Sequence, residues 1–226
     1  MYFGRISKAN NINNKTSLTI NLDTDILGKI SRLNTGAGVS AEVRLNDGRN
    51  ITVEQRKKIY ATLGDISKHL GYPPEELKMI MKYYFIAETG EEYFSLSNCS
   101  VTLARDFIDY LISFSIQWDI PLSEPGYLRA EDIDKYLYMC LKTRTCCISG
   151  KKHADIHHCL GSRVGAGYNR NKIDNRGRKL IALSREYHNL VHDKGEEEVF
   201  KTYGVYGIEL DEKTLKELGL SVKNIF

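Results

Sequence analysis

Histidine is concentrated in one stretch of this 226-residue chain. Five of its six histidines lie between Cys146 and His192, and the sixth is His69. A neutral imidazole can bind a metal ion and can also take up a proton near neutral pH, so the cluster predicts metal binding, acid–base chemistry, or both. The clustered residues are His153, His157, His158, His188 and His192.

The spacing of four of these histidines indicates where their side chains point. Residues 154–158 are expected to form a short strand, in which consecutive side chains face opposite ways. One of His157 and His158 can therefore bind a metal ion while the other faces a substrate beside it. His188 and His192 are four residues apart in an expected helix, so both can reach a single ion. Three nitrogen ligands with open positions are typical of a catalytic metal site.

A basic, glycine-rich loop lies between the two histidine segments. Residues 151–183 include eight Lys and Arg but only two Asp, whereas the whole chain has a formal net charge of +3. A run of charge by itself is usually solvated surface. Beside a histidine cluster, it favours a polyanion such as nucleic acid as the partner.

The composition is that of an ordinary globular protein. Apolar residues make up 42% of the chain, no apolar run approaches the length of a membrane span, and Met1–Arg5 has no signal-like hydrophobic region. We therefore expect no membrane association and a cytoplasmic location. The five cysteines are odd in number and follow no secreted framework, which favours reduced, buried thiols.

The elements that must position the histidines divide the chain into three expected parts. They are a β-rich segment over residues 1–50, a helical module over residues 51–125 and a histidine-bearing domain over residues 126–226. The chain is thus predicted to be α+β, with an N-terminal β/helical module followed by a C-terminal domain that contains the site.

Local patterns give the expected secondary structure within these parts. Ser17–Leu22 alternates with period two, Val39–Val43 is β-prone, and Asn46-Asp-Gly is a hairpin turn signal. Thr52 can cap a helix that ends at Gly71. Further helices are expected over residues 74–85, around 103–114, and over 131–143, 195–203 and 211–218, with a strand over 205–210.

These motifs carry a resemblance to a known family. The strand, loop and His-x-x-x-His helix resemble the ββα-metal motif of HNH nucleases, particularly the DNase domains of colicins. The chain is similar to HNH nucleases encoded by phages of Gram-positive bacteria over roughly residues 45 to 210, and its helical region resembles the phage Orf (NinB) recombination proteins. The matching segments are residues 55–66, 141–144, 155–158, 164–174, 183–189 and 200–208.

The resemblance implies a role for each histidine. His157, His188 and His192 become the ligands of one divalent metal ion (Mg²⁺, Mn²⁺ or Zn²⁺), and His158 becomes the general base that activates water. Basic residues of the loop would hold the DNA backbone without reading bases. They are Arg163, Arg170, Lys172 and Arg176.

Two positions depart from the family pattern. Many HNH domains carry an asparagine nine residues before the first helical histidine, where Lys179 stands here, so Asn169, Asn171 or a backbone carbonyl would have to brace the base. Related proteins also often hold a structural zinc ion with two pairs of ligands. This chain has a single thiolate at the equivalent positions, which predicts that the second zinc is absent. The four positions are Cys146, Ser149, Ser184 and Tyr187.

Three functions are compatible with these observations. The first is a metal-dependent DNA endonuclease with a phage or prophage role in recombination, replication or defence, acting in the cytoplasm of a bacterial host. The second is a non-catalytic DNA-binding recombination mediator that keeps the HNH scaffold. Beside DNA, single-strand-binding protein or other recombination proteins are expected partners, and an oligomer is compatible with either function. The third is a structural zinc module, which would not need His158 beside the ligands.

Overall fold

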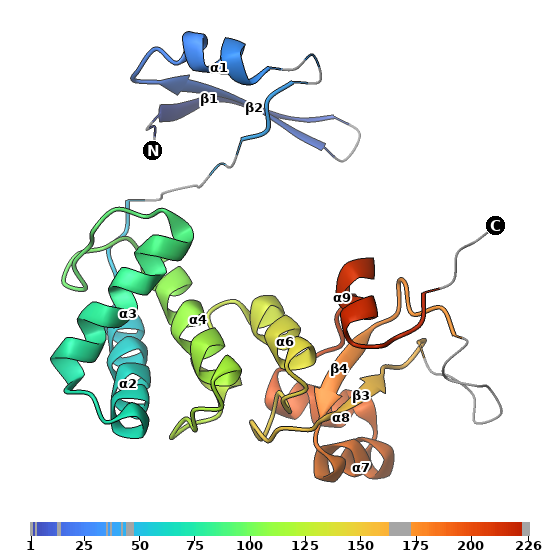
Figure 1. The fold of residues 1–226 in the computed structure, drawn as a ribbon. Helices are drawn as coiled ribbons and strands as arrows, with labels where there is room; N and C mark the ends of the chain where they lie inside the picture. Colours follow the sequence, from blue (N-terminus) through green and yellow to red (C-terminus); the bar gives the residue numbers. More distant parts are fainter. Residues whose placement is uncertain are drawn as a thin grey trace. The chain divides into compact units, whose positions relative to one another are not determined.

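The computed structural model describes residues 2, 4–12, 15–34, 36, 38–41, 43, 48–162 and 173–222. The chain divides into two compact units, Met1–Leu45 and Asn46–Phe226. Helices and small antiparallel sheets are present together, which confirms the α+β class (Figure 1). No helix in the described ranges has both the length and the apolar character needed to cross a membrane.

The first unit consists of a hairpin and a short helix. Strand β1 (Gly4–Ile12) pairs antiparallel with β2 (Lys15–Leu22), with an irregular register between Ile6 and Lys8. The predicted strand over Ser17–Leu22 is thus confirmed. Helix α1 (Leu27–Leu33) was not anticipated, and the described residues of Val39–Val43 form no strand. The turn expected at residues 46–48 falls partly outside the described residues.

Three long helices begin the second unit. They are α2 (Val53–Leu70), α3 (Pro74–Thr89) and α4 (Val101–Gln117). The predicted N-terminal cap of α2 is present, because Thr52 and Gln55 each accept from the other's backbone amide. The helix ends at Gly71, whose φ of 77° is the left-handed conformation that glycine tolerates. Helix α3 runs four residues further than its pattern indicated.

The core of this helical region is aromatic. Phe85 on α3, Phe107 on α4 and Phe94 on the segment between them lie edge to face, with ring centroids 5.2–5.8 Å apart. All three are at most 7% exposed. Burial of this apolar surface fixes α3 and its following segment against α4.

Helix α6 (Ile133–Lys142) connects the helical region to the histidine region. It follows the one-turn helix α5 (Gly126–Arg129) and contacts both α4 and strand β4 (Leu180–Leu183). Its entry is held by the buried Asp109 of α4, whose Oδ1 accepts from the amides of Glu131 and Asp132 at 3.0 and 3.3 Å. The helical and histidine regions are therefore packed through one shared element (Figure 1).

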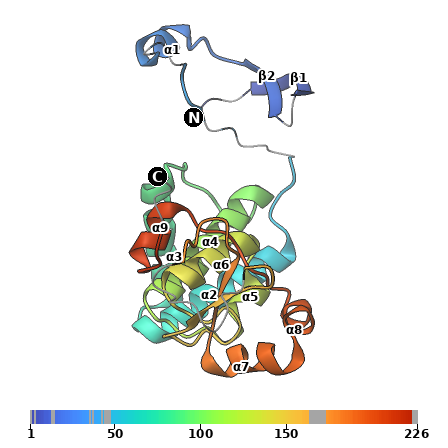
Figure 2. The same ribbon diagram turned by 90° about the vertical axis from the view of Figure 1, so that its right-hand side faces the viewer.

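The histidine region is a strand pair followed by a helix. Strand β3 (Asp155–His158) pairs antiparallel with β4, so that His157 lies opposite Ile181, and α7 (Arg185–Lys194) follows β4 directly. All four residues of β4 have 0% exposure, which anchors the pair in the core. Helix α8 (Glu196–Tyr203) packs beside α7 (Figure 2).

The last segment partly follows its prediction. Helices α8 and α9 (Glu212–Glu217) are confirmed, but the strand expected over Val205–Leu210 is wrong: Ile208 makes a single bridge to Leu180. Gly207 lies close to the core there, since a Cβ built on it would be 2.2 Å from Cys159 Sγ. A close approach at one residue anchors this segment without a full strand ladder. All five cysteines are free and buried, as predicted.

Candidate metal centre

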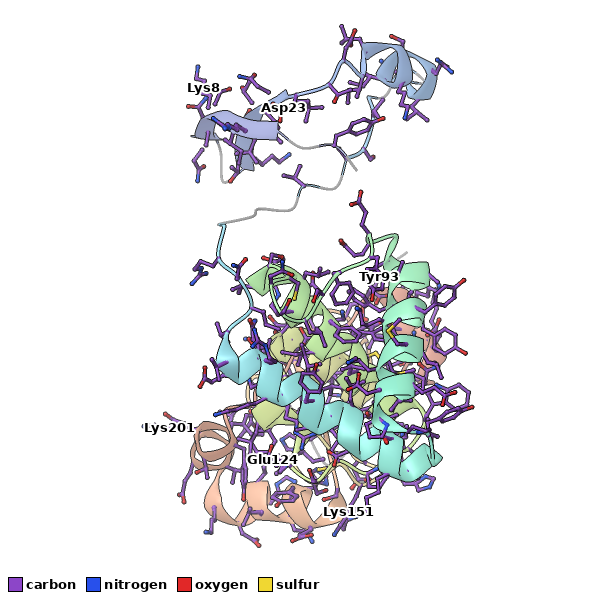
Figure 3. The ribbon with its side chains drawn as sticks, turned by 90° about the vertical axis from the view of Figure 1, so that its left-hand side faces the viewer. Lys8, Asp23, Tyr93, Glu124, Lys151 and Lys201 are labelled. Carbon is purple, nitrogen blue, oxygen red and sulfur yellow. The ribbon has the colours of Figure 1, made fainter. Side chains whose placement is uncertain are left out.

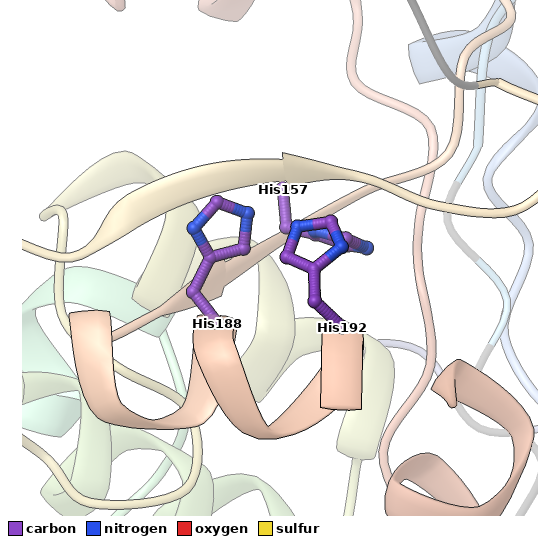
Figure 4. A group of neighbouring side chains, drawn as sticks. All are labelled: His157, His188 and His192. Carbon is purple, nitrogen blue, oxygen red and sulfur yellow. The ribbon is translucent and has the colours of Figure 1, made fainter. Parts of the chain in front are cut away.

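Three imidazoles converge between β3 and α7. His157 extends from β3 toward His188 and His192, which lie one turn apart on α7 (Figure 4). The ring centroids are 5.0 Å apart for His157 and His188, 5.6 Å for His157 and His192, and 4.9 Å for the helical pair. One ring nitrogen of each residue lies within 4.8 Å of the others. The structure thus brings together the three histidines for which the sequence predicted metal ligation.

The carboxylate of Asp155 lies beside the first helical histidine. Its Oδ2 is 3.3 Å from His188 Nδ1, and it lies two residues before His157 on the same face of β3. A carboxylate beside one ring nitrogen turns the other toward a metal, as in the carboxylate–histidine pairs of metal sites. Burial lowers the pKa of His188, and the Asp155 charge opposes that effect.

Glu196 lies beside the Nε2 atom of His157, whereas Asp155 lies beside the Nδ1 atom of His188. Its Oε2 is 3.4 Å from His157 Nε2, and both of its oxygens accept the amide of Leu160, at 2.9 and 2.8 Å. His157 is 3% exposed, and this burial lowers its pKa, against the raising effect of Glu196. Lowered pKa values keep His157 and His188 neutral, which is the state that binds a metal. The donor set therefore fits a divalent ion.

His158 points away from this centre, as strand alternation predicted. Its Nε2 is 2.9 Å from Asn175 Oδ1. The Asn175 amide can have only one orientation, because its Nδ2 donates to the carbonyl oxygens of Ile173 and Ser221 at 3.1 and 3.0 Å. The Oδ1 atom must therefore accept, and His158 Nε2 must carry a hydrogen. A neutral ring then has its lone pair on Nδ1.

Asn175 is a brace that the sequence reasoning missed. It is 2% exposed and its backbone also contacts Ser221, so the side chain is held on both sides. The expected alternatives Asn169 and Asn171 lie outside the described residues. At the family's usual asparagine position, the backbone of Lys179 bonds to Cys159 and to Ser162. A side chain four residues earlier supplies the contact to the histidine.

The structure locates one of the four basic residues predicted to bind DNA. Arg163, Arg170 and Lys172 lie outside the described residues. Arg176 forms a two-pronged ion pair with Asp174, with Nη2 2.7 Å from Oδ2, and hydrogen bonding to that carboxylate raises its pKa. A phosphate at Arg176 would have to compete with Asp174.

Two of the positions equivalent to a second zinc site, Cys146 and Ser149, contact each other. The amide of Ser149 donates to Cys146 Sγ at 3.4 Å, and Ser184 Oγ is buried without a hydrogen-bond partner among the described residues. Among the described residues, one group of side chains is close enough together to hold a metal ion. It consists of His157, His188 and His192.

The sequence patterns assign no role to either acidic side chain of the metal centre, Asp155 or Glu196. Asp155 was part of the matching motif, and a carboxylate two residues before His157 was an available signal. Glu196 gave no such signal, because Glu197 and Glu198 follow it in the first turn of α8, where acidic residues commonly stabilise the helix.

Comparison with known proteins gives one match. A family described as "Putative HNHc nuclease" matches residues 23–221. No curated protein and no solved structure matches the chain.

Proposed function

The chain belongs to the HNHc nuclease family, and from that premise we propose that it is a metal-dependent endonuclease that hydrolyses DNA phosphodiester bonds. His157, His188 and His192 hold one divalent ion, and His158 is the general base. The observation that carries this proposal is the opposite direction of two adjacent histidines on β3. His157 joins the triad of imidazoles, whereas His158 contacts Asn175.

The protein side chains have separate tasks in this proposal. His158 takes the proton of the attacking water at Nδ1, because Asn175 holds its Nε2 as a hydrogen-bond donor. Asp155 and Glu196 orient two of the ligands. A divalent ion in the triad supplies charge stabilisation for the scissile phosphate and the leaving oxygen. Imidazole ligands favour Zn²⁺ or Mn²⁺ over Mg²⁺ in affinity.

DNA contacts in this proposal come from the basic loop. Arg163, Arg170, Lys172 and Arg176 hold the backbone, and Arg176 does so only by exchanging Asp174 for phosphate. Such contacts are independent of base sequence and weaken with salt as counterions are released. The likeness to phage recombination proteins motivates a role in phage or prophage recombination, replication or defence.

A non-catalytic recombination mediator is the second candidate. Its motivation is the likeness of the helical region to Orf (NinB) proteins, together with the missing asparagine at Lys179, which would leave the base without a brace. Asn175 supports the nuclease instead, because it provides a hydrogen bond to His158 from a different position. The two candidates still predict opposite results for cleavage.

The deciding experiment is His158→Ala. Loss of a positioned general base typically lowers the rate by about two to four orders of magnitude. Metal affinity and DNA binding should stay close to those of the parent, because His158 is outside the triad. The control is His153→Asn in the same stretch: His153 is exposed, and asparagine tolerates its φ of 60°.

Plasmid nicking with Mg²⁺, Mn²⁺ or Zn²⁺ is the measurement. The nuclease predicts cleavage by the parent and by His153→Asn, and its collapse in His158→Ala. Undiminished cleavage in His158→Ala would contradict the role given to this residue. No metal-dependent cleavage by the parent would favour the mediator.

A further inference from the structure

A pocket of about 380 Å³ lies on the helical region, built by elements that do not form the metal centre. Helix α2 contributes Arg56 and Tyr60, helix α3 contributes Lys78 and Lys82, and the segment after α3 contributes Tyr93 and Ser97. Cations and aromatic rings thus line one cavity together. Tyr93 lies on the α3 side of the helical region (Figure 3).

Lys82 is a buried cation that faces this pocket. Its residue is 4% exposed, and its Nζ is 4.1 Å from the ring centroid of Tyr93 and 4.9 Å from that of Phe94. Among the described residues, no carboxylate forms an ion pair with Lys82. Burying an ammonium group is costly unless an anion compensates it, and aromatic faces compensate only part of the charge. The geometry therefore leaves a place for an anionic group.

The other charges around the pocket leave it positive. Arg56 donates from Nε to the carbonyl oxygen of Leu96 at 3.1 Å and from Nη2 to that of Ser97 at 3.0 Å. Neutral carbonyls do not cancel its charge. Lys78 pairs with Glu75, the one carboxylate of the lining. Two cationic charges, on Arg56 and Lys82, thus remain beside the cavity.

Tyr93 offers an aromatic face to a ligand. Its residue is 71% exposed although Lys82 lies against its ring, so much of the ring is open to solvent. Tyr60, the other tyrosine of the lining, is 45% exposed. Exposed rings beside cations are the combination by which proteins bind single strands, since bases stack on the rings and phosphates meet the cations.

We propose that this pocket binds one nucleotide of single-stranded DNA, with the phosphate at Lys82 and Arg56 and the base stacked on Tyr93. A base inside a duplex has both faces covered by its neighbours, so the site selects unpaired strands. The pocket volume is near the lower end of the range for ligand sites, which suits one nucleotide better than a folded peptide. The choice of DNA as the ligand rests on the proposed nuclease function.

The first test removes the stacking face. Affinity for a labelled oligo-dT strand is measured by fluorescence anisotropy in EDTA, so that cleavage cannot occur. Tyr93→Ala should weaken binding by at least about fivefold, the lower limit expected for loss of one base stack. Tyr83→Ala is the matched control, because Tyr83 is 72% exposed on α3, next to Lys82 in the sequence, but does not line the pocket. Equal affinities of the two variants would overturn the proposal.

The second test removes the buried charge. Lys82→Met keeps the apolar stem of the side chain but removes its charge, so it should weaken oligo-dT binding. The slope of log affinity against log salt should become shallower by about 0.7, which is the value for one phosphate contact on a single strand. Thermal melting establishes that the variant is folded. If Lys82→Met does not fold, Tyr93→Ala decides the question alone. A folded variant with the parent's slope would contradict the assignment.

Further measurements separate this proposal from its alternatives. A decaglutamate peptide that binds through Lys82 more tightly than oligo-dT would overturn the proposal and assign the pocket to an acidic protein segment. Oligo-dT binding that depends on Tyr93 supports the pocket even if the parent cleaves no DNA under any metal. That combination would refute the nuclease function while leaving the strand site intact.

Discussion

Replacing Asn175 by alanine tests whether His158 has to be held in position. The Asn175 side chain makes three hydrogen bonds, one to His158 Nε2 at 2.9 Å and two to the carbonyl oxygens of Ile173 and Ser221. Both carbonyls retain another donor, because Ser221 Oγ still reaches Ile173 and the amide of residue 175 still reaches Ser221. His158, by contrast, loses the hydrogen bond of its side chain, and no other side-chain partner of it is found among the described residues.

The expected magnitudes follow from this arrangement. Three lost hydrogen bonds at about 1 kcal/mol each lower the free energy of unfolding by about 2–3 kcal/mol. The rate of DNA cleavage should fall by about 10- to 100-fold, the usual cost of removing a group that orients a functional side chain. This loss is smaller than that of His158→Ala, because the base itself remains. KM should not change, since Asn175 is buried and offers no phosphate contact.

The rate of DNA cleavage is measured by single-turnover cleavage of a labelled duplex. The assay is run at a temperature at which urea denaturation shows that the variant is folded. Ser221→Ala is the control for loosening of the segment, because it removes the Ser221 Oγ contact to Ile173 but leaves the contact between Asn175 and His158. A folded Asn175→Ala protein that cleaves within twofold of the parent would refute the bracing role. Equal losses in both variants would attribute the effect to the segment as a whole.

Three other predictions concern metal binding and stability. Zn²⁺ at 100 times its Kd should stabilise the parent protein by about 2.7 kcal/mol in thermal unfolding. Replacing His188 and His192 together by alanine should abolish this gain. Undiminished Zn²⁺ affinity of the double variant in calorimetry would refute the ligand set. Burial lowers the pKa values of His157 and His188, so the metal-free folded state binds fewer protons than the unfolded state just below pH 6.5. In EDTA, the stability of Asp109→Asn, which lacks the opposing titration of the buried Asp109, should therefore fall as the pH drops from 7.5 to 5.5, and a flat dependence would contradict this. Burial also raises the pKa of Asp109 to about 6. Above that pH, the ionised Asp109 lowers the free energy of unfolding. This penalty disappears as the pH falls from about 6 toward 3.8, because the carboxyl group becomes protonated in the folded protein first. Asp109→Asn keeps an acceptor oxygen and should raise the free energy of unfolding at pH 7.5 by up to about 3 kcal/mol, and a loss in urea denaturation would contradict the sign.

Features that depend on neighbouring residues could be predicted from the sequence. The cap formed by Thr52 and Gln55 and the end of α2 at Gly71 follow from contacts within a few positions. The placement of His188 and His192 on one face of α7 follows from helical spacing, and the divergence of the two histidines on β3 follows from strand alternation. Each of these relations is set by backbone geometry alone, so a linear pattern carries it.

The surroundings of these histidines depended on the tertiary structure. Asn175 lies 17 positions from His158, and Glu196 lies 39 positions from His157. No spacing rule connects such pairs, because their contact requires β3, β4 and α8 to pack in one particular arrangement. The burial of Lys82 beneath Tyr93 likewise arises only when α3 and its following segment close over α4. The sequence by itself determined which side chains could perform the chemistry, and long-range packing decided which neighbours orient them, since burial and direction are properties of the assembled core.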